Sequence, residues 1–473
     1  MRLLDTDVRY FDDETPGIPP LTNEWGSTIS LLDACLVTGS PEQEIKSINS
    51  YEDPEYPEVY WISKLLLNEG HGFKKDLSVI EIRGCEQEIY NSYHRVQEVT
   101  SDTITIAFEK LFVTEKPKDS VGGFLGMTVK TAPLGYTKVF EAPQKAVYKN
   151  ATEGDNVCYL RVDNACPPGY DLTWAKFSRV SIFNHMDYLD DYDYRPGRVK
   201  APQGKEDYTE PESVKGLGAS GKYGVSKWYQ RVDYTGSTLY ENRVPPTSSS
   251  GPGYWDLIGD NRTFYFFPAV VDGTSTNRRT FRACYAFGEY VDINNESNTN
   301  NHILCCHQHS DSANTHFGHY NSNPGYLEEK NTFSRLGYDR GNYMLNDSVT
   351  TTYLNTQSYK FTFESMTSSY QSISGTNRFM DYKVDPIFPI INLLPVYLKT
   401  DTKLLKGRAR GYLFMATDIL DIEKYGLKIS GRDVLGNFIS ARDKKVVFLN
   451  GTYSVANSQI AISTFAFQLN NWE

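Results

Sequence analysis

The densest group of potential metal ligands lies in residues 302–319. Five of the eight histidines and the adjacent Cys305 and Cys306 fall within this segment. His316 and His319 have a spacing that zinc ligands use. A structural zinc site, however, usually takes its cysteines from a tight C-x-x-C knuckle, and adjacent residues of a strand point to opposite faces. The pattern therefore favours a strand that ends in a polar loop, with a zinc site as the alternative.

A glycine-rich segment, residues 216–222, matches G-x-G-x-x-G and resembles a phosphate-binding loop. Such motifs bind phosphate because a strand delivers glycine amides to the N-terminus of a helix. Residues 208–213 are too polar for a buried strand, and Tyr223 stands where a magnesium-binding Ser or Thr is needed. Residues 225–228 look like a strand rather than a helix. We therefore predict a flexible loop here, not a nucleotide site.

The acidic run at residues 187–193 could offer oxygen ligands to calcium. It lacks the glycine and the terminal glutamate of a standard calcium loop, so a solvated acidic loop is favoured. No G-x-S-x-G or H-E-x-x-H motif is present. His94 and His185 stand singly among aromatic residues, as packing histidines do. We therefore expect no enzymatic activity, no catalytic or cofactor-binding residues, no metal ligands and no cofactor.

Charge and hydropathy exclude further classes. The chain has 473 residues and a net charge of −11, without a dense run of Lys or Arg. Nucleic-acid binding usually needs a basic face, so we expect no direct nucleic-acid partner. No stretch approaches the ~20 apolar residues of a membrane span, and the N-terminus has no apolar core of the signal-peptide type. The seven widely spaced cysteines predict reduced thiols.

The elements that must position these residues are mainly β. Tyr outnumbers Phe by 34 to 24, and aromatic and β-branched residues favour strands. One short helix is predicted at residues 26–39, where Ser27 can cap the start and Gly39 suits the left-handed stop. Prolines keep the preceding residues 11–20 extended. The fold class is therefore mainly β and multi-domain, with one short N-terminal helix.

Short β runs begin near residue 60. Residues 77–82 and 103–108 alternate with a period near two, which predicts a small β-sandwich or barrel. Further core strands are predicted at residues 146–148, 158–162 and 263–267. Residues 446–453 carry the strongest short hairpin signal, an Asn-Gly turn between β-formers.

These patterns divide the chain into four parts. They are an N-terminal arm and helix (1–54), a small β-sandwich module (55–130), a β domain with long loop insertions (131–380, with insertions at 186–253 and 290–375), and a C-terminal β region (381–473).

Several stretches together resemble a family of bacteriophage virion structural proteins. A D-x-x-x-P-G-x-P-x-L arm leads into a G-S-x-I-x-x-L-D-A-x-L-V helix, and the following β module is similar to those of phage tail and fibre proteins. The matching stretches are residues 11–21, 26–37, 70–73, 79–84, 90–96, 103–106, 132–140, 145–149, 159–163, 257–265, 393–397 and 406–411. The insertions at 186–253 and 290–375 depart from the family pattern.

The resemblance implies a non-enzymatic structural component of the virion, in the tail, baseplate or neck. Its expected partners are other virion proteins and further copies of the chain, since aromatic side chains give broad contact area. It would be made in the host cytoplasm and located in the virion. We further predict that residues 1–25 bind a neighbouring subunit. The alternatives are a head-decoration or collar protein, and a carbohydrate-binding or carbohydrate-cleaving receptor protein.

Overall fold

The described residues form four β-sheets and a single short α-helix, so the fold class is mainly β, as predicted. In the computed structural model, strands make up 46% of the described residues. The structure describes residues 6–22, 24–120, 126–152, 157–166, 177–183, 185–191, 226–230, 233–234, 255–272, 280–282, 285–292, 302–305, 343–346, 357–365, 393–400, 405–415, 434–435, 446–456, 459–469 and 472. The sheets have fifteen, five, four and four strands.

The two four-stranded sheets form a β-sandwich-like unit, which we call the module (residues 43–131). One sheet has the order β2-β9-β5-β6 and the other β3-β4-β8-β7. Their bounds are β2 Gln43–Glu44, β3 Ser47–Glu52, β4 Tyr60–Leu66, β5 Val79–Arg83, β6 Tyr93–Arg95, β7 Glu98–Val99, β8 Thr103–Glu109 and β9 Thr128–Thr131, with a 3-10 turn η2 at Glu88–Tyr90. Apolar side chains from both sheets share one core, as expected from the alternating runs at 77–82 and 103–108.

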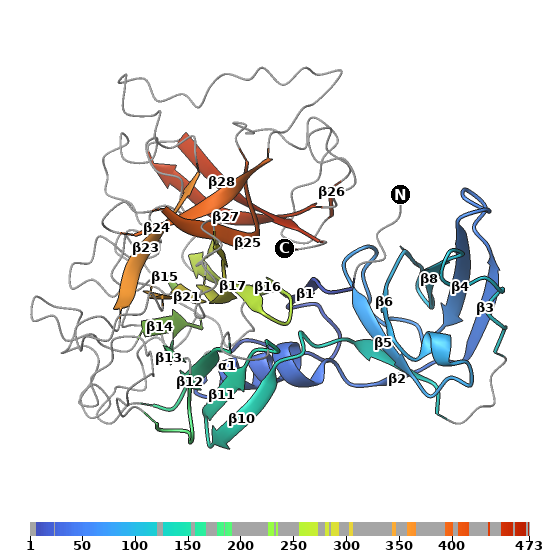
Figure 1. The fold of residues 1–473 in the computed structure, drawn as a ribbon, viewed down its shortest axis with the longest axis horizontal. Helices are drawn as coiled ribbons and strands as arrows, with labels where there is room; N and C mark the ends of the chain where they lie inside the picture. Colours follow the sequence, from blue (N-terminus) through green and yellow to red (C-terminus); the bar gives the residue numbers. More distant parts are fainter. Residues whose placement is uncertain are drawn as a thin grey trace, which may run out of the picture.

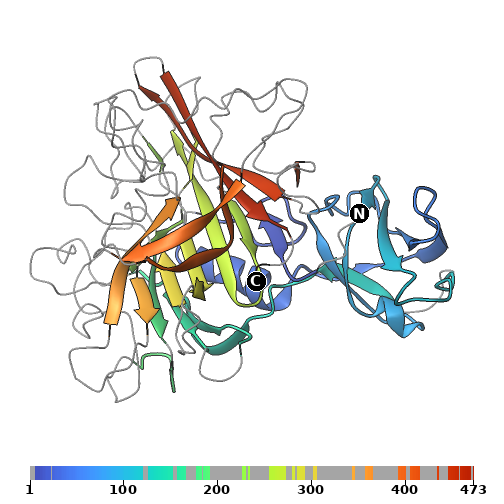
Figure 2. The same cartoon turned by 45° about the horizontal axis from the view of Figure 1, so that its top comes forward.

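The module lies to one side of the rest of the chain, which we call the body (Figure 1 and Figure 2). The body contains a five-stranded sheet of order β10-β11-β12-β13-β14. Its bounds are β10 Thr137–Ala142, β11 Lys145–Lys149, β12 Tyr159–Asp163, β13 Phe177–Phe183 and β14 Ser226–Tyr229. The predicted core strand at 146–148 lies within β11, and the one at 158–162 matches β12 except that Cys158 precedes it.

The fifteen-stranded sheet is the other half of the body. Its main path is β1-β16-β17-β18-β27-β28-β25-β24-β23-β22-β21-β19, and β19 also pairs with β17, so the path returns to β17. The bounds are β1 Arg9–Asp12, β15 Asp233–Tyr234, β16 Trp255–Gly259, β17 Thr263–Asp272, β18 Thr280–Arg282, β19 Tyr285–Glu289, β20 Val291–Asp292, β21 His302–Cys305, β22 Tyr343–Asn346, β23 Gln357–Ser365, β24 Leu393–Thr400, β25 Leu405–Met415, β26 Val434–Leu435, β27 Val446–Ala456 and β28 Gln459–Gln468.

A helix joins the two sheets of the body in one core. The α-helix α1 (Ser27–Leu32) continues as a π-helix, η1 (Asp33–Thr38), over the predicted range. Its buried residues pack with apolar side chains of β11, β12, β16 and β17. Gly39 ends it with a φ of +74°, and a Cβ there would lie 2.2 Å from the Thr131 carbonyl oxygen, so glycine is required.

The predicted Ser27 cap is wrong. Gly26 occupies the N-cap position, and the side-chain carbonyl of Asn164 accepts hydrogen bonds from the amides of Gly26 at 2.7 Å and Thr28 at 3.2 Å. The Ser27 hydroxyl instead accepts a hydrogen bond from the Thr22 amide at 2.7 Å and donates one to the Pro20 carbonyl at 3.2 Å. The serine therefore fixes the turn before the helix rather than the first helical turn.

Two predictions about turns and loops also fail. The Asn-Gly pair at 450–451 lies inside β27, where the register with β28 shifts, because strand pairing on both sides overrides local turn preference. The ranges 186–253 and 290–375, predicted as long loop insertions, contain β15, β20, β22 and β23, in addition to β14 and β21, which match the strands predicted at 225–228 and before the polar loop at 302–319. Within the first, Trp228 is fully buried and stacks on Tyr285 at 5.5 Å between ring centroids.

Candidate functional site

Of the segments with metal- or phosphate-binding motifs, 302–319 and 216–222, the structure describes only residues 302–305. His302, Ile303 and Leu304 are buried in β21, which confirms the predicted strand. Cys306 and the histidines after it, like the glycine-rich segment 216–222, lie outside the described residues. Among those that are described, no three His, Cys, Asp or Glu side chains are placed to hold a metal ion. The zinc alternative thus stays open.

The acidic run is not simply solvated, which corrects the prediction for its described part, residues 187–191. Asp190 accepts a hydrogen bond from the buried Arg161 at 2.6 Å. Asp191 is buried, and its carboxylate accepts from the Asp187 amide at 2.9 Å. Arg161 therefore anchors this loop to β12. A buried charge demands such a partner, but the sequence could not reveal that Arg161 faces the loop.

A polar cluster near the middle of the body was missed by the sequence analysis. Burial raises the pKa of the Glu289 carboxyl, which accepts a hydrogen bond from the side-chain amide of Asn150 at 3.0 Å and one from the Thr152 hydroxyl. Nearby, Arg410 pairs with Asp260 at 2.6 Å. Raised acid pKa values mark catalytic sites and structural networks alike. Glu289 of β19 thus binds the segment that follows β11, and Arg410 of β25 binds the turn between β16 and β17, so the cluster serves packing within the body.

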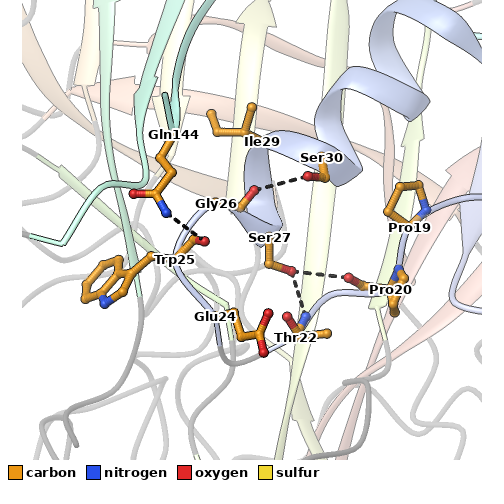
Figure 3. Close-up of a pocket in the computed structure, with 10 residues that line it drawn as sticks. All are labelled: Pro19, Pro20, Thr22, Glu24, Trp25, Gly26, Ser27, Ile29, Ser30 and Gln144. Carbon is orange, nitrogen blue, oxygen red and sulfur yellow. Dashed lines mark hydrogen bonds between the residues drawn. The ribbon is translucent and has the colours of Figure 1, made fainter. Parts of the chain in front are cut away.

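One open pocket of about 350 Å³ lies where the N-terminal arm enters α1 (Figure 3). Its lining residues are Pro19, Pro20, Thr22, Glu24, Trp25, Gly26, Ser27, Ile29, Ser30 and Gln144. An aromatic ring beside hydroxyl and carboxylate groups is a combination that binds sugars. Most of these polar groups, however, are engaged within the chain: Ser30 bonds Gly26, and Gln144 donates to the Trp25 carbonyl at 3.2 Å. The pocket is therefore mainly part of the arm's attachment.

The arm belongs to the body, and the prediction that residues 1–25 bind a neighbour rather than their own core is wrong for residues 6–22. Strand β1 pairs with β16 in register, Arg9 opposite Gly259 and Asp12 opposite Asp256. Phe11 and Leu21 are fully buried in the body core. A strand of the arm can fill a vacant edge of its own sheet as well as that of a neighbour, and composition does not distinguish the two.

A network of buried polar contacts, which we call the joint, holds the module to the body. Arg95 of β6 donates to the carbonyl of Val8 at 2.6 Å and to that of Leu469 at 3.1 Å, so one guanidinium contacts segments near both ends of the chain. Lys74 forms an ion pair with the fully buried Asp12. Charge-assisted hydrogen bonds of this kind are among the strongest in proteins.

The chain enters and leaves the module through two segments that bond to each other. The Ser40 amide donates to the Thr131 carbonyl at 3.2 Å, and the Thr131 amide donates to the Ser40 hydroxyl at 2.8 Å. Next to them, β2 pairs with β9. The joint and these paired connections restrain the module against rotation about its linkers.

Exposed apolar side chains gather at the far end of one module sheet. Seven large apolar side chains are exposed among the described residues, and five of them lie where β3 ends, β4 begins and β8 ends. They are Tyr51, Tyr56, Val59, Leu111 and Phe112, which we call the apolar tip. Leu111 and Phe112 are 79% and 78% exposed. Exposed apolar clusters of this kind mark binding surfaces.

Comparison with known proteins assigns the chain to no family. No protein-family model matches the sequence, and no curated protein is significantly similar to it. None of the helices in the described part of the chain is both long and apolar enough to cross a bilayer. Function must therefore be inferred from the resemblance of the sequence motifs and from the geometry of the joint and the tip.

Proposed function

We propose that this chain is a non-enzymatic structural component of a bacteriophage virion, in the tail, baseplate or neck, where other virion proteins are its partners. The resemblance to virion proteins supports the setting, since its motifs occur in order along most of the chain. The arm is not part of this proposal, because residues 6–22 belong to the fold of their own chain.

The observation that carries the structural role is the joint. A protein that connects neighbours in a particle has to transmit force between its parts without bending. Arg95 and Lys74 bind the module to segments near both termini, and Asp12 is fully buried in this contact. Separating the module from the body would leave the buried Asp12 carboxylate without its partner, and an uncompensated buried charge typically costs about 3–5 kcal/mol.

Mass spectrometry of purified phage particles tests the setting, and electron cryo-microscopy then gives the location. We expect the chain in mature particles at a fixed copy number, in the tail, baseplate or neck. Density on the head surface or at the collar would instead favour a decoration or collar protein. Absence from particles, together with glycan-array binding or depolymerisation of host polysaccharide, would favour a receptor protein and refute the proposal.

A further inference from the structure

The apolar tip is held in a fixed shape. The turn after β8 is closed by hydrogen bonds from the amides of Phe112 and Val113 to the Glu109 carbonyl, both at 3.0 Å. The Trp61 indole donates to the Val113 carbonyl at 2.9 Å, which fastens the end of this turn to β4. Because the turn is ordered before any partner arrives, binding through Leu111 would lose little conformational entropy.

Acidic residues surround the tip. Residues 51–60 and 109–115, which carry the five apolar side chains, contain six acidic residues, of which only Asp53 is buried, and a single lysine. That lysine, Lys110, is turned to the sheet: its Nζ lies 3.8 Å from the centroid of the Trp61 ring and 2.9 Å from Glu52. Beyond this range, Lys116 pairs with Asp119 at 3.7 Å. The exposed Glu55 and Glu58 thus border the apolar surface.

We propose that the apolar tip is a docking surface for a partner protein whose contact surface is apolar at its centre and bordered by lysine or arginine. Leu111 and Phe112 would fill the apolar centre, and Glu55 and Glu58 would face the basic border. Complementary charge of this kind selects the partner and speeds association. The apolar tip would bind such a partner whether or not the chain is part of a virion.

The charge pattern disfavours two other occupants. Membranes with anionic lipids attract basic residues, whereas the acidic border of the tip would be repelled. A second copy docking tip to tip would bring two acidic borders into one interface, and like charges brought together across an interface cost several kcal/mol. The chain as a whole is also acidic, with a net charge of −11.

The experiment uses the full chain and two fluorescent 14-residue helical peptides, one of leucine and lysine and one of leucine and glutamate, measured by fluorescence anisotropy. We expect the chain to bind the lysine peptide at least ~10-fold more tightly than the glutamate peptide. The double variant Leu111→Ser, Phe112→Ser should weaken that binding by about 30-fold or more, the effect of removing a contact hot spot. Tyr188→Ser, at an exposed aromatic residue of the body, is the matched control and should change nothing.

Charge reversal gives a second, independent readout. The pair Glu55→Lys, Glu58→Lys should reverse the peptide preference, whereas Glu69→Lys, after the opposite end of β4, should not. Circular dichroism confirms that each variant is folded. Two results with the peptides would overturn the proposal: equal affinity for both peptides, or unchanged binding by the double serine variant. It would also be overturned by tighter binding to phosphatidylglycerol vesicles than to the lysine peptide, or by a dimer that the double serine variant abolishes.

Discussion

Acidification should destabilise the module through one histidine. His94 of β6 is 8% exposed, and its Nε2 lies 3.0 Å from the Tyr90 carbonyl oxygen, so the neutral ring donates a hydrogen bond there. The ring also packs edge-on against Phe108 at 5.2 Å. Burial lowers the pKa of His94 from 6.5 to about 4. This packing role confirms the prediction for His94, whereas the same prediction for His185 is wrong, because His185 is exposed and pairs with Asp187 at 2.8 Å.

The sign of the effect follows from this shift. Between the two pKa values the unfolded chain binds a proton at His94 that the folded chain does not, so stability falls as pH decreases from about 6.5 towards 4. At about 1.36 kcal/mol per pKa unit, the full loss below pH 4 is roughly 3.4 kcal/mol, and roughly 2.5 kcal/mol is lost between pH 7.5 and pH 4.5. That is a large share of the ~5–15 kcal/mol typical of a folded protein.

The assay compares the native chain with His94→Gln, whose amide can still donate to the Tyr90 carbonyl but does not titrate. Urea unfolding at pH 7.5 and pH 4.5, combined with hydrogen exchange of the β8 amides, measures the stability of the module. We expect the native chain to lose roughly 2.5 kcal/mol more than the variant over this range. The same pH dependence in both proteins, or a histidine signal from residue 94 that titrates near its ordinary pKa, would refute the reasoning.

Three further changes test the packing. Gly39→Ala should destabilise the chain by about 3 kcal/mol or more in urea unfolding, because the new Cβ would lie 2.2 Å from the Thr131 carbonyl oxygen. The control Gly70→Ala has the same φ of +74° but open space around it, so it should cost only about 1 kcal/mol. Arg95→Leu removes the donor shared by both ends of the chain, and limited proteolysis should then cut between module and body; a native digestion pattern would argue against the joint. Trp228→Ala should cost about 3–5 kcal/mol, measured by thermal unfolding, and a cost below ~1 kcal/mol would contradict its place in the core.

The experiments on the tip and on the joint address different properties of the chain. The joint concerns stability and rigidity, and its variants should leave peptide binding at the tip intact. The tip concerns recognition, and its variants at Leu111 and Phe112 should leave stability unchanged because both side chains are exposed. A chain that fails one set of tests can therefore still pass the other.

Local features of the chain were predictable because short-range physics decides them. The alternating residues of β5 and β8 predict strands, since side chains of a strand alternate between its faces. Gly39 was predicted to end the helix because a positive φ is costly for any residue with a Cβ. The apolar tip also has a local signal, the pair Leu111 and Phe112 directly after the charged residues Glu109 and Lys110, although the exposure of the pair could not be predicted from it.

The mainly β fold class, the short helix with its stop, and several core strands can be predicted from local sequence, because each depends on neighbours within a few residues. Long-range packing sets the pairing of β1 with β16, the burial of Trp228 and the contacts of Arg95 with segments near both ends of the chain. Those contacts join residues far apart in sequence. They form only when whole sheets pack together and bury polar groups that must then find partners, and no local pattern records which partner that will be.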